Sequence, residues 1–97
     1  MARILVIDDE AAIRRILKEI LEHEQYQVDT AESAVDALPL VKENEYDAIL
    51  CDIKMPQMDG IEFLEEAKNI TDAPIIMISG HGTIDTAVEA IKKGAFD

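Results

Sequence analysis

The sequence alternates short, continuous apolar runs with longer segments of helical periodicity, and this alternation restricts the possible fold more than any other feature. The apolar runs, each typical of a strand buried on both faces of a sheet, are residues 4–7, 48–51 and 75–78. The first helical stripe, with apolar residues three and four positions apart, consists of Ile13, Ile16, Leu17, Ile20 and Leu21. Alternating strands and helices predict an α/β fold of three layers, in which helices cover both faces of a doubly wound parallel sheet.

Weaker patterns lie between these elements. Alternating polar and apolar residues at 26–30 predict a half-exposed edge strand. Ser33, Asp59 and Thr83 stand where helix N-caps are expected, ahead of three further apolar stripes. Pro39 interrupts the stripe behind Ser33. Because proline costs about 3 kcal/mol in a helix interior, we expect that helix to kink or to restart there.

The predicted fourth strand, residues 75–78, has the apolar pattern of an inner strand, yet no further strand pattern follows it. We therefore expect a single domain, residues 1–97, whose fifth strand is missing. An unpaired apolar strand edge favours pairing, or exchange of elements, with a second copy of the chain. A homodimer is the expected consequence.

Charge and cysteine content narrow the functional classes. The chain carries 9 basic and 21 acidic residues, a net charge of −12, which disfavours binding to nucleic acid or to an anionic membrane and permits a cation or a basic partner. The single cysteine, Cys51, cannot form an intrachain disulfide and is expected in the core. The apolar run near the N-terminus is too short for a signal peptide or a membrane span, so we expect a cytoplasmic protein.

Four polar side chains follow the predicted strands of the sheet. Asp8 and Asp9 come after the first strand, Asp52 after the third and Ser79 after the fourth. Ligands of parallel sheets collect at the carboxyl ends of the strands, and crowded carboxylates favour a hard divalent cation such as Mg²⁺. Beside such an ion, an aspartate can act as a nucleophile toward phosphorus. Taken singly, Asp9 also fits a helix N-cap, Asp52 an Asx turn and Ser79 a loop hydroxyl.

Three runs of residues carry a resemblance to a known family. The runs are LVIDDE at 5–10, DIKMPQMDG at 52–60 and ISG at 78–80. Together they resemble the receiver domain of two-component response regulators, and the resemblance covers the whole chain. It implies a flavodoxin-like sheet with strand order 2-1-3-4, in a chain that lacks the fifth strand and the fifth helix of the family.

The resemblance also implies a role for each matching residue. Asp52 matches the phosphoryl acceptor, which takes its phosphoryl group from a sensor histidine kinase. Asp8 and Asp9 match the acidic pair that holds Mg²⁺ together with Asp52, and Lys54 matches the position whose backbone carbonyl completes the metal site. Ser79 matches the switch hydroxyl that turns toward the phosphoryl oxygens. The chain would thus be a regulatory domain and not an enzyme, apart from its own phosphorylation and dephosphorylation.

Residues 79–88 resemble receivers of the nitrogen-regulation type. In that subfamily an ATPase domain and a DNA-binding domain follow the receiver, so the resemblance implies a parent protein that controls transcription through these output domains. The family's lysine before the fifth strand has no counterpart here. Lys92 and Lys93 lie about 14 Å down the last predicted helix from Thr83, at about 1.5 Å per residue, which predicts that they cannot replace it.

Three other functions fit parts of the pattern. A Mg²⁺-dependent phosphatase with an aspartate nucleophile would need a substrate cap, for which the sequence has no segment. A flavin-binding module would place a phosphate against the acidic run at 8–10, which would repel it. A fragment that dimerises without accepting phosphoryl groups remains compatible with the phospho-acceptor fold.

Overall fold

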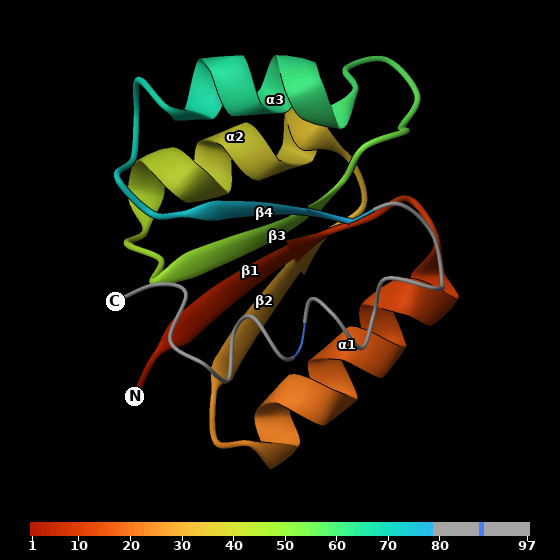
Figure 1. Ribbon diagram of the computed structural model, residues 1–97, viewed down its shortest axis with the longest axis vertical. Helices are drawn as coiled ribbons and strands as arrows, with labels where there is room; N and C mark the ends of the chain where they lie inside the picture. The colour runs from red at the N-terminus through yellow and green to blue at the C-terminus, as the bar shows by residue number, and fades with distance from the viewer. Residues whose placement is uncertain (79–87, 89–97) are drawn as a thin grey trace.

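The strands of the chain form one parallel sheet. The computed structural model describes residues 1–78 and residue 88. Within them the sheet has the order β2-β1-β3-β4 (Figure 1), with parallel pairing throughout. The strands are β1 (Arg3–Ile7), β2 (Gln27–Ala31), β3 (Ala48–Asp52) and β4 (Ile75–Ile78). The predicted α/β fold and strand order are confirmed, and the half-exposed strand lies at the edge as expected, one residue later than the sequence predicted.

Helices cover both faces of the sheet. In Figure 1, α1 (Ala11–His23) lies on one face, and α2 (Ala34–Glu43) and α3 (Gly60–Ala67) lie together on the other. Each face therefore has its own apolar core. One core joins Ile4, Val6 and Leu50 of the sheet to α1, and the other joins Leu5 and Ile49 to α2 and α3.

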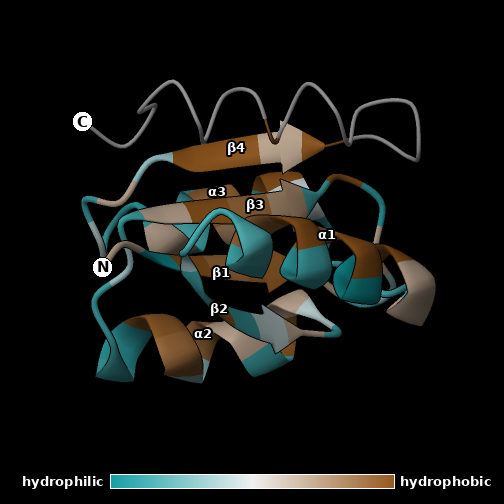
Figure 2. Ribbon diagram, turned by 90° about the horizontal axis from the view of Figure 1, so that it is seen from below, coloured by the Kyte–Doolittle hydropathy of each residue, from teal (hydrophilic) through white to brown (hydrophobic). Residues whose placement is uncertain are grey.

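The central strands are buried on both sides. All four apolar residues at 4–7 and those at 48–51 have no exposed surface, and Figure 2 shows the hydrophobic colour running along β1 and β3. Successive side chains of a strand point to opposite faces, so a continuous apolar run supplies both cores at once. Cys51 belongs to this set, and its predicted place in the core is confirmed.

The predicted stripe of α1 is partly wrong. Ile13, Leu17 and Leu21 are buried, but Ile16 is 38% exposed. At about 100° per residue, the three buried positions centre on Leu17, and Ile16 lies about 100° from that centre. Ile20, nearer the centre, is partly buried against the same core. The spacing of apolar residues thus predicted a wider buried face than the part of α1 that contacts the sheet.

The other helices largely follow their predicted signals. Ser33 caps α2 by accepting a hydrogen bond from the Asp36 N–H at 3.0 Å, and Asp59 and Glu62 form a complete capping box on α3. Contrary to one expectation, α2 does not restart at Pro39 but runs through it. The carbonyl that loses its donor to Pro39 is that of Val35, whose side chain is 48% exposed.

The last predicted helix lies almost wholly outside the described residues. Within it, Val88 is helical and packs, buried, on the α1 side of the sheet, as predicted. The predicted cap Thr83 and the lysines Lys92 and Lys93 fall outside the described part of the chain. No helix within the described residues is long and apolar enough to cross a membrane.

The C-terminal end of α1 forms a Schellman motif with an unfavourable residue. The N–H groups of Gln25 and Tyr26 donate to the carbonyls of Glu22 and Leu21, at 3.0 and 3.1 Å. Gln25 has φ of 71°, in the left-handed region. Glycine is the usual residue at this position because a Cβ atom makes the left-handed conformation costly.

We predict that Gln25→Gly stabilises the protein by about 0.5–1 kcal/mol, because it removes the Cβ penalty at a positive φ. Urea unfolding followed by circular dichroism measures the change. Gln25→Ala is the control, since it retains Cβ and should give no such gain. Equal effects of glycine and alanine would contradict the conformational explanation.

Candidate functional site

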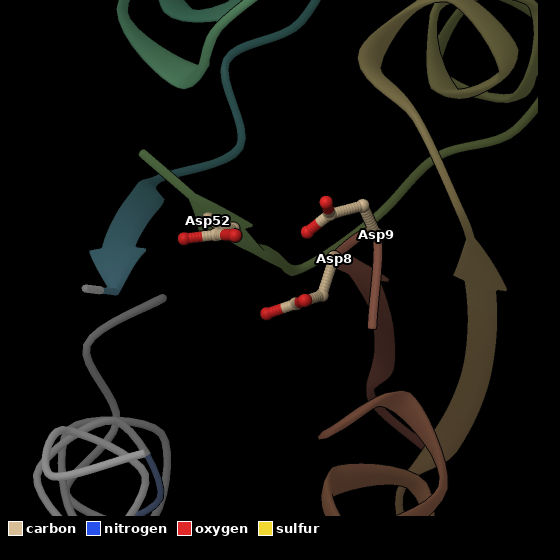
Figure 3. Close-up of side chains that lie close together, drawn as sticks. All are labelled: Asp8, Asp9 and Asp52. Atoms are coloured by element: carbon tan, nitrogen blue, oxygen red, sulfur yellow. The ribbon is translucent and has the colours of Figure 1, made fainter. Parts of the chain in front are cut away.

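The pairing of β1 with β3 brings three aspartates to one edge of the sheet. Ile7 pairs with Cys51, so the residues that follow them, Asp8 and Asp52, leave neighbouring strands at the same level. Figure 3 shows the carboxyl groups of Asp8, Asp9 and Asp52 converging from the ends of β1 and β3. One oxygen of each lies within 4.8 Å of the others. The three carboxylates predicted from the sequence are therefore together.

Asp8 is the most constrained of the three. Its side chain is only 4% exposed. Its N–H donates to the Ala31 carbonyl at 3.2 Å, its Oδ1 accepts from the Glu10 N–H at 2.9 Å, and its carbonyl accepts from the Arg14 guanidinium at 2.7 Å. The backbone and one side-chain oxygen are thus held, and the other oxygen is left for the cluster.

Burial and mutual repulsion shift the acidity of the site. Desolvation is the main cause that raises the pKa of Asp8 to about 6, and the nearby Asp52 and Asp9 carboxylates add to the shift. Desolvation also raises the pKa of Asp52, while N–H groups of Lys54 and Ile53 act in the opposite direction. Carboxylates that repel one another in this way favour the binding of a cation, which offsets their negative charge.

The structure tests the simpler explanations for two of these residues. The N-cap of α1 is Glu10, not Asp9, and no side chain caps it. Capping therefore does not explain Asp9, which is exposed beside Asp52. For Asp52, the backbone N–H of Lys54, two residues later, lowers the pKa of the carboxyl, so a local backbone influence does act on this residue. That influence does not exclude its place in the cluster, which Asp52 also occupies.

The two other predicted site residues are placed less fully. The Lys54 side chain is exposed, in the loop between β3 and α3, so its side chain does not join the cluster. Ser79 lies outside the described residues. The strand before it ends at Ile78, which pairs with Asp52.

Gly60, at the start of α3, closes the loop that follows Asp52. Its N–H donates to the Ile53 carbonyl at 2.8 Å. A Cβ atom on Gly60 would overlap the Asp52 carbonyl oxygen and would lie 2.9 Å from Ile53 Cα. Only a residue without a side chain allows α3 to begin this close to the end of β3. The resemblance had placed Gly60 in this loop, but the close contact itself depends on the tertiary structure.

The donor set of the cluster fits a hard cation. All three groups offer oxygen only, without sulfur or imidazole, which suits Mg²⁺ better than zinc or copper. Oxygens bound to one Mg²⁺ at about 2.1 Å are at most about 4.2 Å apart, close to the spread observed here. Small side-chain movements, or one bridging water, would therefore bring all three groups to one ion.

We predict that Gly60→Ala destabilises the protein by about 1–3 kcal/mol through the clash with the Asp52 carbonyl. Helix propensity alone predicts the opposite sign, a gain of about 1 kcal/mol for alanine over glycine. The free energy of unfolding from urea titration separates the two. Glu66→Ala, at an exposed position of α3, is the control. A stabilised Gly60→Ala protein would refute the close contact.

We predict that Asp8→Asn stabilises the metal-free protein near neutral pH by about 1–3 kcal/mol. Asparagine keeps the acceptor for the Glu10 N–H and removes the buried charge. Because the pKa of Asp8 is raised from 3.8 to about 6 on folding, the ionised form opposes folding. Protonated Asp8 stabilises the folded protein fully below pH 3.8, and this stabilisation is lost as the pH rises to about 6.

The advantage of Asp8→Asn should therefore shrink as pH falls from about 6 to about 4, where the wild-type carboxyl is itself protonated. Urea unfolding in the presence of a chelator at several pH values measures this. Asp72→Asn, at an exposed position, should show no such dependence. A constant advantage across that range would contradict the raised pKa.

Comparison with known proteins identifies the family. Residues 4–97 match the family model of the response regulator receiver domain. The chain is 42% identical over 95 residues to the transcriptional regulatory protein ZraR of Klebsiella oxytoca, and the match covers 97% of this chain but only 21% of that protein. The chain therefore spans about a fifth of the length of this relative.

Solved structures show the same fold. A response regulator receiver domain protein from Clostridium thermocellum has a TM-score of 0.78 and 40% identity, over 97% of this chain and 77% of its own. A chain of the complex of histidine kinase ThkA with response regulator protein TrrA has a TM-score of 0.83 and 34% identity, over 96% of this chain and 97% of its own. Sequence, sheet order and neighbours agree that this chain belongs to the response regulator receiver domain family.

Proposed function

We propose that this chain is the phospho-acceptor switch of a two-component system, with Asp52 as the residue that is phosphorylated. The observation that supports this most is the convergence of Asp8, Asp9 and Asp52 at the ends of β1 and β3. The resemblance that the sequence carries adds Mg²⁺ to this site. Asp8, Asp9, Asp52 and the backbone carbonyl of Lys54 would hold the ion.

Exposure favours Asp52 over Asp8 as the nucleophile. Asp52 is partly exposed at the end of β3, whereas Asp8 is buried and one of its oxygens accepts from the Glu10 N–H. An incoming phosphoryl group can therefore reach Asp52 without disturbing the turn. The buried Asp8 is better suited to orient a cation than to attack phosphorus.

In the proposed transfer, an ionised Asp52 is the nucleophile and the donor lies in line with it. One carboxylate oxygen of Asp52 attacks the phosphorus of a phosphohistidine, the P–N bond breaks, and its electron pair stays on the imidazole nitrogen. The product is an acyl phosphate on Asp52. The three aspartates would hold Mg²⁺, which would supply positive charge against the oxygens of the transferring group. The N–H groups of Ile53 and Lys54 keep the Asp52 carboxyl ionised to lower pH than burial alone would allow.

A sensor histidine kinase is the proposed donor. The similar ThkA–TrrA complex pairs a histidine kinase with a response regulator, and the net charge of −12 suits a partner with a basic docking surface. The name of ZraR, a transcriptional regulatory protein, supports control of transcription as the output. Several expectations from the sequence stay predictions. They are the domain bounds 1–97, the cytoplasmic location, the Ser79 switch, the output domains and the homodimer.

We predict that incubation with acetyl phosphate and Mg²⁺ adds one phosphoryl group to the wild-type chain and none to Asp52→Ala. Intact-protein mass spectrometry measures the adduct. Asp72→Ala, an exposed aspartate in the loop before β4, is the matched control and should still be phosphorylated.

An adduct on Asp52→Ala equal to that on the wild type would show that the acceptor is another residue. No adduct on any variant would argue against the phospho-acceptor function for this chain. Steady release of phosphate from a generic phosphate ester, dependent on Asp52, would favour a phosphatase instead.

A further inference from the structure

We propose that Arg14 is a positioning residue of the cation site, which holds Asp8 in place through its backbone. This inference rests on the proposed function, because it concerns the same Mg²⁺ site. The sequence did not point to Arg14, which is followed on α1 by a second arginine, Arg15. Arg14 is half-buried beside the buried stripe of α1, whereas Arg15 is exposed.

The contact joins two elements that meet at the site. The Arg14 guanidinium donates to the Asp8 carbonyl at 2.7 Å, six residues back along the chain. Asp8 is the first residue after β1, and α1 begins at Ala11. The side chain thus reaches from the first turn of α1, across the turn that carries Asp8 and Asp9, to the end of the strand.

This contact completes the anchoring of Asp8. The N–H of Asp8 is held by Ala31 and its Oδ1 by the Glu10 N–H. Among the described residues, no backbone N–H donates to the carbonyl at the end of the strand, which accepts from Arg14 instead. With three of its four polar groups fixed, Asp8 presents one oxygen to the cluster in a single orientation. Ligands held in place beforehand lose less entropy when a cation binds.

The guanidinium contacts the site through the Asp8 backbone carbonyl. Within the described residues it forms no ion pair with a carboxylate of the cluster. Replacing Arg14 would affect cation binding in two opposite ways, through its charge and through its hold on Asp8. Removing a positive charge near the cluster strengthens the attraction for Mg²⁺, whereas freeing Asp8 weakens binding.

Arg15 supplies a matched control for this difference. It lies on the same helix and is exposed, and its side chain makes no hydrogen bond or ion pair with the described residues. Arg14→Met and Arg15→Met change the net charge by the same amount, and methionine retains the aliphatic stem and a high helix propensity. They differ in whether the Asp8 carbonyl keeps its donor.

The experiment is an NMR-detected Mg²⁺ titration of the wild type and both variants, with amide hydrogen exchange of the metal-free proteins. We expect Arg14→Met to weaken Mg²⁺ binding about three- to tenfold, in line with the typical net contribution of one hydrogen bond. Arg15→Met should bind as well as the wild type or slightly better. Exchange of the Glu10 N–H, which reports the Asp8 turn, should quicken only in Arg14→Met.

Unchanged or tighter Mg²⁺ binding by Arg14→Met would overturn the inference and leave the proposed function intact. Equal weakening by both variants would also overturn it. A wild-type chain that binds no Mg²⁺ would instead overturn the metal site of the proposed function, and the inference with it. Should Arg14→Met fail to fold, Arg14→Gln, which cannot reach as far, carries the same expectation.

Discussion

The parallel pairing of β1 with β3, both buried on two faces, is the constraint on which the rest of the structure depends. Burial on both faces requires a continuous apolar run in each strand and leaves no room for a polar side chain within residues 4–7 and 48–51. The first polar residues after the runs, Asp8 and Asp52, are therefore forced to the same edge. The covering helices then follow from the two apolar faces of the sheet, each of which needs a cover.

Bringing the carboxylates together at this edge of the sheet destabilises the folded protein. The pKa of Asp8, raised to about 6, means that its charge opposes folding at neutral pH. A receiver with an apolar or amide residue at this position would be more stable and would bind cations less well. A residue that lowers stability in this way is expected at a ligand-binding site, because binding and stability favour different residues there.

Backbone contacts hold the site together more than contacts between its charged side chains do. Gly60 lets α3 begin against the Asp52 carbonyl, and Arg14 holds the Asp8 carbonyl from α1. Each contact joins the backbone at the end of a strand to the helix that follows that strand. The carboxylates can then face one another, despite their repulsion, because their backbones are fixed independently. The proposed switch would thus start from a rigid acceptor site.

The sequence by itself determined the α/β alternation, the two strands buried on both faces, the caps at Ser33 and Asp59, and the carboxylates at the strand ends. Each depends on short-range periodicity or on the chemistry of one or a few neighbouring residues. Only the tertiary structure decided that Ile16 is exposed, that α2 runs through Pro39, and that Gly60 and Arg14 approach the Asp52 and Asp8 carbonyls. Those outcomes depend on how wide a strip of helix meets the sheet and on which backbone groups approach across a turn. Spacing along the chain does not encode these distances, because they are fixed only when the layers pack.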